Sequence, residues 1–162
     1  MTIDINLLAG QGIYTLLLNV HKEVTVTVGS LGKQRFPVGT YSYTGSALGK
    51  GSSLKNRVAR HLRKEKRYFW HIDYLLADES VSVDAVVAAE TSQKMECEVN
   101  LHIKAELGGK VQIKGFGASD CRKSCESHLL YFPDNENIDL LVQNFVEHFS
   151  SVSGVLAVYV TR

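Results

Sequence analysis

The stretch YSYTGSALGKGSSLKNRVARHLR, residues 41–63, decides the fold and suggests a site. Its first residues alternate tyrosine with small hydroxyl residues, a period-two pattern that predicts a strand with Tyr41 and Tyr43 on one face. A glycine-containing loop follows, and we expect a helix to begin near Ser52 or Ser53, since serine is a favoured N-cap. An aromatic hydroxyl at a strand end, a glycine loop and a helix N-terminus are the parts of a phosphate-binding site.

The helix after this loop carries an apolar and a cationic stripe. Leu54, Val58 and Leu62 recur at every fourth position and are expected to pack on the core, while Arg57 and His61 flank them. Further cations continue around the predicted helix and its end, namely Lys55, Arg60, Arg63 and Lys64. Such a row is either a solvated helix face or a contact to nucleic-acid phosphates that reads no sequence. The tyrosine–glycine turn just before the helix favours phosphate binding.

Composition limits the classes of protein that the chain can be. It has 162 residues, 44% of them hydrophobic, which suits one domain or one domain with an appendage. The net charge of +1 excludes a global attraction to nucleic acid, but cations cluster between residues 57 and 67. We predict no signal peptide and no membrane segment, and three cysteines suit a reducing cytoplasm better than a disulfide framework.

Hydrophobic patterning over the rest of the chain predicts an α+β protein. Runs of β-branched and apolar residues predict strands at residues 12–20, 23–28, 81–89, 110–114, 128–132 and 155–160. Helical spacing or turn signals predict helices at residues 69–77, 92–107 and 138–149. We expect strand 23–28 to be the hairpin partner of strand 12–20, and residues 29–39 and 115–127 to be loops.

Two short motifs carry a resemblance to a known superfamily. Gly12-Ile13-Tyr14, followed by a hairpin and then Tyr43-Thr44-Gly45, resembles the paired signature of the GIY-YIG nucleases. In that superfamily a later helix carries an arginine and, one turn on, a tyrosine or histidine, which match Arg57 and His61. A glutamate on a further helix completes the superfamily site, and Glu96 fits that position.

One branch of the superfamily is more similar still. It shares the segments GSALG, RHLR, WHIDYLL, FGASDC and SHLLYF, and its members are functionally uncharacterised archaeal and bacterial proteins. Some of them are fused to helix-hairpin-helix, endonuclease III-type glycosylases. Over residues 8–133 the resemblance implies a GIY-YIG-like α+β domain, a small mixed sheet flanked by helices with an enlarged hairpin. Residues 134–162 would form a C-terminal helix–strand extension that packs on the domain, completes a sheet edge or makes a dimer contact.

The resemblance also implies an activity, a divalent-metal-dependent endonuclease that hydrolyses DNA in repair, with a functional link to a base-excision glycosylase. Glu96 would hold one Mg²⁺ or Mn²⁺, and Tyr14 would take the proton from the attacking water. Tyr43 would hold Tyr14 and the phosphate in place. Arg57 would clamp the phosphate, and His61 would donate to a phosphate oxygen or protonate the leaving group.

Other interpretations of these residues stay open. Tyr14 lies in an apolar strand, where most tyrosines are core aromatics, and Glu98 competes with Glu96 as the metal ligand. Ser46 stands where many relatives have a lysine, and the usual asparagine near the domain end has no clear counterpart, with Asp120 and Ser119 as candidate substitutes. The alternative to an enzyme is a nucleic-acid-binding or adaptor module that keeps the fold and the basic helix without cutting.

Two further clusters allow a metal site or a supporting role. Cys121, Cys125 and His128 lie close in sequence, and Cys97 or His71 could supply a fourth zinc ligand. Because only one cysteine pair is present, we favour a polar loop with semi-buried thiols over zinc. The segment WHIDYLL at residues 70–76 predicts packing, with His71 able to orient the phosphate site from behind.

Overall fold

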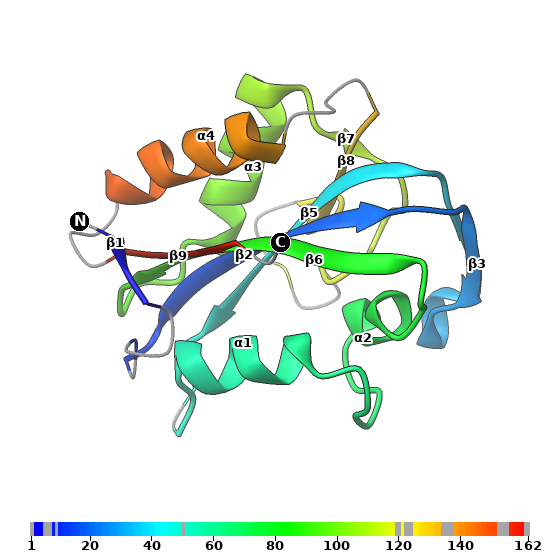
Figure 1. The fold of residues 1–162 in the computed structure, drawn as a ribbon, viewed down its shortest axis with the longest axis horizontal. Helices are drawn as coiled ribbons and strands as arrows, with labels where there is room; N and C mark the ends of the chain where they lie inside the picture. The colour runs from blue at the N-terminus through cyan, green and yellow to red at the C-terminus, as the bar shows by residue number, and fades with distance from the viewer. Residues whose placement is uncertain are drawn as a thin grey trace.

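A central β-sheet with helices on both faces forms the fold, which is α+β as predicted (Figure 1). The structure, a computed structural model, describes residues 2–4, 8, 10–49, 51–118, 121, 125–133, 138–151 and 156–160. The strands are β1 (Thr2–Ile3), β2 (Gly12–Val20), β3 (Val24–Thr27), β4 (Lys33–Phe36), β5 (Gly39–Ala47), β6 (Val81–Glu90), β7 (Lys110–Val111), β8 (Leu129–Phe132) and β9 (Leu156–Val160). The helices are α1 (Leu54–Leu62), α2 (His71–Leu76), α3 (Glu96–Leu107) and α4 (Ile138–Ser150), with a 3₁₀ turn at Gly29–Leu31.

The main sheet has seven strands in the order β1-β9-β6-β2-β5-β8-β7, and every pair in it is antiparallel except β1 with β9. In Figure 1 helices α1 and α2 cover one face and helices α3 and α4 cover the other. Strand β2 shows why both faces are apolar. Its side chains point alternately to the two faces, so that Tyr14, Leu16 and Leu18 join the core under α1 and α2, while Ile13 and Leu17 join the core under α3 and α4.

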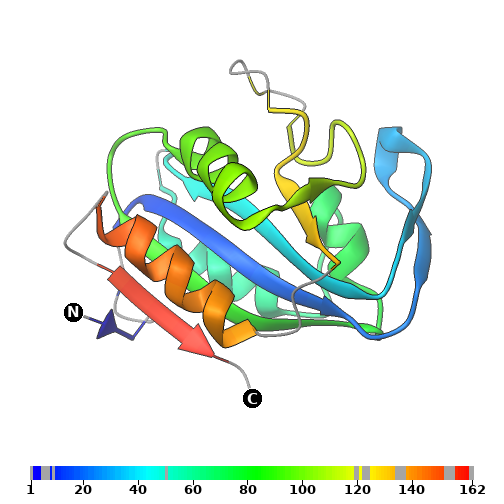
Figure 2. The ribbon, with the colours of Figure 1, turned by 90° about the horizontal axis from the view of Figure 1, so that it is seen from above.

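The hairpin around β2 differs from the predicted one. Strand β2 pairs along its whole length with β5, from Gly12 opposite Ala47 to Val20 opposite Gly39. Strand β3, which was expected to be its partner, pairs instead with β4, in a segment predicted to be a loop. The two form a separate ribbon inserted between β2 and β5, which projects from the end of the sheet (Figure 2). The enlarged hairpin is therefore present, with a different pairing.

Helix α1 begins as predicted but its buried face differs. The Ser53 side chain accepts a hydrogen bond from the Asn56 N–H at 3.1 Å, so Ser53 is the N-cap. Leu54 and Val58 are buried, but Leu62 is 37% exposed and His61 is buried in its place. At 100° per residue, a spacing of four drifts round the helix, so the seventh position after Leu54 faces the core better than the eighth.

Other boundaries moved by a few residues. Helix α3 begins at Glu96, not at residue 92, since the Thr91 hydroxyl accepts the Gln93 N–H and favours a turn there. The predicted strand at residues 110–114 is only the two-residue β7. The C-terminal segment joins the same sheet and core: β9 pairs with β6, and buried α4 side chains pack in the core under α3. Across the described ranges, no helix is both long and apolar enough to cross a membrane.

Candidate active site

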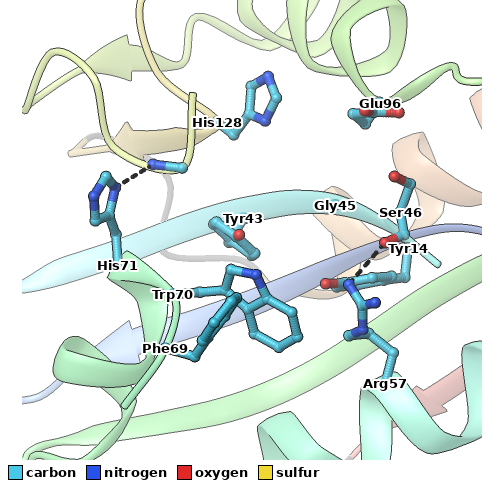
Figure 3. A pocket seen from close by; sticks show the side chains of 11 residues that line it. Tyr14, Tyr43, Gly45, Ser46, Arg57, Phe69, Trp70, His71, Glu96 and His128 are labelled. Atoms are coloured by element: carbon cyan, nitrogen blue, oxygen red, sulfur yellow. Dashed lines mark hydrogen bonds between the residues drawn. The ribbon is translucent and has the colours of Figure 1, made fainter. Parts of the chain in front are cut away.

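A cavity of about 360 Å³ opens at the edge of the sheet, beside the end of β5. It brings together residues that are distant in sequence, from β2, β5, α1, α2, α3 and the two loops before α2 and before β8 (Figure 3). Its lining residues are Tyr14, Tyr43, Gly45, Ser46, Arg57, Phe69, Trp70, His71, Glu96, Gly117 and His128. Four of the five residues that the sequence nominated for catalysis are in this lining.

The register of β5 explains why the cavity lies there. Strand β8 pairs with β5 only from Thr40 to Tyr43, and the Thr44 N–H bonds to the His128 carbonyl at 3.2 Å. In the described part of the chain no strand continues this edge alongside Gly45 and Ser46. The resulting notch lets side chains from both faces of the sheet meet, since Tyr14 belongs to the α1 face and Glu96 starts α3 on the other.

Gly45 makes room for Tyr14. The two residues face each other in the β2–β5 register, and a Cβ atom at position 45 would lie 2.6 Å from the Tyr14 hydroxyl oxygen. A real Cβ does not approach an oxygen so closely, so any other residue here would displace the tyrosine ring. Tyr14 is 2% exposed yet lines the cavity, so it is both a core aromatic and a cavity residue.

His61 lies behind Tyr14. Its Nε2 is 2.7 Å from the Tyr14 hydroxyl oxygen, while Nδ1 is buried with no hydrogen-bond partner among the described residues. Burial, with a smaller effect of Lys66, lowers the pKa of His61 to about 3, so the imidazole is neutral near pH 7. If the proton is on Nε2, the unpartnered Nδ1 carries only a lone pair. If the proton is on Nδ1, a buried N–H is left without an acceptor, which is the rarer and costlier arrangement. We therefore assign His61 Nε2–H as the donor to Tyr14.

Two opposing influences act on the Tyr14 hydroxyl. Burial raises its pKa well above the ordinary value for tyrosine, whereas the charge and hydrogen bonding of Arg57 lower it. Burial is the larger influence, so the phenol is protonated at neutral pH. Tyr43, 7% exposed, packs its ring edge-to-face with His61 at 6.1 Å between centroids and completes the aromatic side of the cavity.

Arg57 is held in place from two sides. Its Nη1 donates to the Ser46 carbonyl at 3.0 Å, on the open edge of β5 (Figure 3). Its guanidinium also lies over the Trp70 ring, 4.4 Å from the centroid, a cation–π contact. Arg60 covers the same ring at 4.3 Å. Arg57 therefore presents a positioned positive charge to the cavity without a carboxylate partner in the described residues.

Glu96 faces this charge across the cavity (Figure 3). It is 6% exposed and its Oε2 has no hydrogen-bond partner in the described residues, although the exposed Lys94 lies 3.9 Å from Oε1. A buried, unpartnered carboxylate oxygen fits a divalent cation, because Mg²⁺ and Mn²⁺ bind through one or two carboxylates plus water and substrate oxygens. Glu98, the competing candidate, is exposed and outside the cavity lining.

The four cations expected to follow nucleic acid divide into two pairs. Arg60 forms a two-armed ion pair with buried Asp73, with both N···O distances 2.9 Å. Lys64 donates to three backbone carbonyls, those of Leu76, Asp78 and Val81. These two side chains hold α1 to the α2 region. Lys55 and Arg63 are exposed on α1 and at its C-terminus.

Asp73 holds the WHIDYLL segment, residues 70–76, in its conformation. Besides Arg60, it accepts the N–H groups of Phe69 and Trp70, each at 2.8 Å, so it fixes the chain that enters α2. Burial by itself would raise the pKa of Asp73, but these hydrogen bonds outweigh it and hold the pKa below the ordinary value. His71 accepts the Gly117 N–H at 2.9 Å through Nδ1, which ties α2 to the loop on the other side of the cavity.

Sequence reasoning missed several lining residues. Phe69 is 78% exposed at the cavity, and the Trp70 ring makes cation–π contacts with two arginines. The signal for both was the pair of aromatics directly after the basic segment, a pattern typical of nucleic-acid contacts. Nothing in the sequence placed Gly117 and His128 at this cavity, because only the tertiary fold brings them there. Ser119 and Asp120, the proposed replacements for an asparagine, lie outside the described residues.

A second cluster adjoins the cavity. Cys97, Cys121, Cys125 and His128 each offer one ligand atom, and the four atoms all lie within 4.8 Å of one another, close enough to hold a metal ion. Of the two candidates for the fourth ligand, Cys97 belongs to the cluster, whereas His71 is engaged with Gly117.

The fold and the cavity thus define an α+β protein with an arginine, two tyrosines and a glutamate around one opening. Residues 13–151 match the family described as domain of unknown function DUF123, and the chain belongs to this family. The match includes α4, so the family extends beyond the region in which the sequence motifs were found. No curated protein and no solved structure matches the chain.

Proposed function

We propose that the chain is a divalent-metal-dependent endonuclease of the GIY-YIG type that hydrolyses DNA phosphodiester bonds. The observation that carries this proposal is the meeting of Tyr14, Tyr43, Arg57 and Glu96 at one cavity. These residues come from β2, β5, α1 and α3, so no local packing requirement explains why all four meet. Glu96 supports it most, because burying a carboxylate oxygen that has no hydrogen-bond partner among the described residues is costly unless a ligand compensates.

Each side chain has a defined task in this hydrolysis. A divalent cation held by Glu96 would supply positive charge for the non-bridging oxygens of the phosphate. Arg57 would bind the same phosphate with N–H groups beyond those that donate to the Ser46 carbonyl at 3.0 Å and to the Ser52 hydroxyl at 3.5 Å. Tyr43 would lie beside the phosphate, and its ring packs on His61, the residue that contacts Tyr14. His61, which is buried and contacts Tyr14, would be a positioning residue and not a proton donor to substrate.

The proton transfer uses Tyr14. Because Tyr14 is protonated at neutral pH, the step would begin with loss of its hydroxyl proton to solvent, which burial opposes and which the positive charge of Arg57 and the N–H of His61 favour. Water oxygen then bonds to phosphorus while the bond from phosphorus to the leaving sugar oxygen breaks. The proton of the attacking water moves to Tyr14, and the leaving oxygen takes a proton from solvent.

The surroundings of the cavity suit a nucleic-acid strand. Exposed Phe69 offers a face on which a base can stack, and Trp70 with its two arginines lies next to it. Lys55, on the same helix as Arg57, and Arg63, directly after that helix, are exposed and could contact backbone phosphates. These residues also favour the second candidate function, a nucleic-acid-binding or adaptor module without cleavage. The role in repair and the link to a base-excision glycosylase rest on the resemblance of the sequence alone.

One experiment separates the two functions. Wild type, Tyr14→Phe, Arg57→Ala and Glu96→Gln are incubated with branched, nicked and single-stranded DNA in Mg²⁺ or Mn²⁺, and binding is measured in parallel. The endonuclease proposal predicts metal-dependent cutting that all three changes reduce by about 100-fold or more. Binding that is weakened by salt, with no cutting by wild type, would instead establish the binding module.

A further inference from the structure

We propose that Cys97, Cys121, Cys125 and His128 bind one Zn²⁺ in a closed, structural site that forms part of the cavity wall. The ligand atoms come from three places in the fold: the first turn of α3, the loop after Phe116 and the residue before β8. The cluster contains one imidazole and all three cysteines of the chain. Packing alone does not explain such a gathering of the only three cysteines among 162 residues.

The distances suit a single tetrahedral ion. Ligands about 2.3 Å from zinc at tetrahedral angles lie about 3.5–3.8 Å from one another. Cys97 Sγ lies 3.5 Å from His128 Nε2 and 3.2 Å from Cys121 Sγ, and the whole set falls within 4.8 Å. The Cys97–Cys121 separation is well beyond the roughly 2.05 Å of a disulfide bond. Three of the four residues are buried, as structural ligands are: Cys97, Cys125 and His128.

The donor set identifies the metal and its role. Thiolates are soft ligands that select zinc over Mg²⁺, Mn²⁺ or Ca²⁺, and three sulfurs with one nitrogen is a common structural zinc set. Four protein ligands leave no open position for substrate or activated water. The site would therefore stabilise structure and take no part in chemistry.

The position of the cluster shows what it would stabilise. Cys97 directly follows Glu96, and His128 itself lines the cavity. The loop between Gly115 and His128 also carries Gly117, another lining residue, and Asn100 on α3 donates to the Ser127 carbonyl at 2.7 Å. Zinc would fasten this loop to the N-terminus of α3 and so fix Glu96 opposite Arg57. This consequence for the cavity rests on the proposed function, whereas the zinc site itself does not.

The test is the metal content of purified full-length protein, prepared without added metal and measured by elemental mass spectrometry. We expect about one zinc ion per chain in wild type. Cys121→Ser, the mildest change because Cys121 is only half-buried, and His128→Gln should lower the content to near zero. His71→Gln is the matched control, since His71 lines the same cavity outside the cluster, and should keep the metal.

A second measurement covers variants that fail to fold or a protein that loses metal during purification. Reduced, metal-free wild type is titrated with Zn²⁺ against a chromophoric chelator, and thiol alkylation is followed by mass spectrometry. One tight site that protects all three cysteines from alkylation supports the proposal. A Cys97–Cys121 disulfide, another metal in place of zinc, or no tight site would overturn it. These metal measurements use no DNA and so do not depend on the nuclease proposal. A protein that binds zinc but does not cut DNA in the cleavage experiment would contradict only the nuclease proposal.

Discussion

The Tyr14 hydroxyl and His61 Nε2 lie 2.7 Å apart in the interior, although 46 residues lie between Tyr14 on β2 and His61 on α1 in the sequence. This contact links β2 to α1 and holds the Tyr14 hydroxyl at the cavity. His61 is therefore buried on the face of α1 where the sequence predicted Leu62, and Leu62 is exposed. The predictions below follow from this contact and from those around it.

His61 should make the stability depend on pH. Its pKa is lowered to about 3 in the folded protein, against about 6.5 in an unfolded chain. As pH falls below 6.5 the unfolded state takes up a proton that the folded state refuses, so the free energy of unfolding should fall by up to about 1.4 kcal/mol per pH unit. His61→Gln should reduce this slope by about one proton between pH 6 and 4.5, measured by urea unfolding. Equal slopes would show that His61 is not buried as a neutral group.

Gly45→Ala should displace Tyr14. The added Cβ would lie 2.6 Å from the Tyr14 hydroxyl oxygen, so the ring must move at a cost of about 1–3 kcal/mol in the free energy of unfolding. Gly49→Ala is the matched control, because a Cβ there meets only the movable Ser52 hydroxyl, at 3.2 Å. Thermal unfolding should show a loss for Gly45→Ala that clearly exceeds the loss for Gly49→Ala. Similar values would contradict the packing described.

Asp73→Asn should destabilise the protein strongly. The change removes the charge that compensates Arg60 and weakens the hydrogen bonds to two backbone N–H groups, at a cost of about 3–5 kcal/mol. Glu23→Gln is the control, since Glu23 pairs with Arg35 on the surface, with exposures of 49% and 68%, and should cost less than about 1 kcal/mol. Denaturant unfolding at pH 7 measures both. A small effect at Asp73 would mean that this ion pair is not buried.

Phe69→Ala should weaken nucleic-acid binding without affecting stability. The side chain is 78% exposed at the cavity, so it contributes little to the core, and loss of one stacked base costs about 1–3 kcal/mol of binding. We expect about tenfold weaker binding of single-stranded DNA at fixed salt. Leu140→Ala, on the outer side of α4 with 51% exposure, should leave binding unchanged. Equal binding by all three proteins would exclude Phe69 from the contact.

Particular residues show what the sequence could and could not predict. The strand pattern around Tyr43, the serine N-cap and the amphipathic α4 are local signals, and the corresponding elements were confirmed. The partner of β2 was wrong, because EVTVTV and YSYTG are both good strands and only the tertiary fold selects between them. Arg60 and Lys64 were predicted to contact nucleic-acid phosphates, yet each has buried partners from a segment that sequence spacing cannot align with α1.

The metal cluster shows the same limit. Cys121, Cys125 and His128 are near neighbours in the sequence, but Cys97 reaches them only because α3 begins at Glu96 beside the loop. The start of α3 in turn decides which glutamate faces the cavity, since Glu96 is buried and Glu98 is exposed.

The most direct test of the central claim compares two glutamate variants that differ by two positions. DNA cleavage in Mg²⁺ or Mn²⁺ is measured for wild type, Glu96→Gln and Glu98→Gln, with circular dichroism to show that each protein is folded. The account predicts cutting by wild type and by Glu98→Gln, and cutting lowered by about 100-fold or more in Glu96→Gln. Cutting that survives in Glu96→Gln, or no metal-dependent cutting by folded wild type on any of the DNA structures, would contradict it.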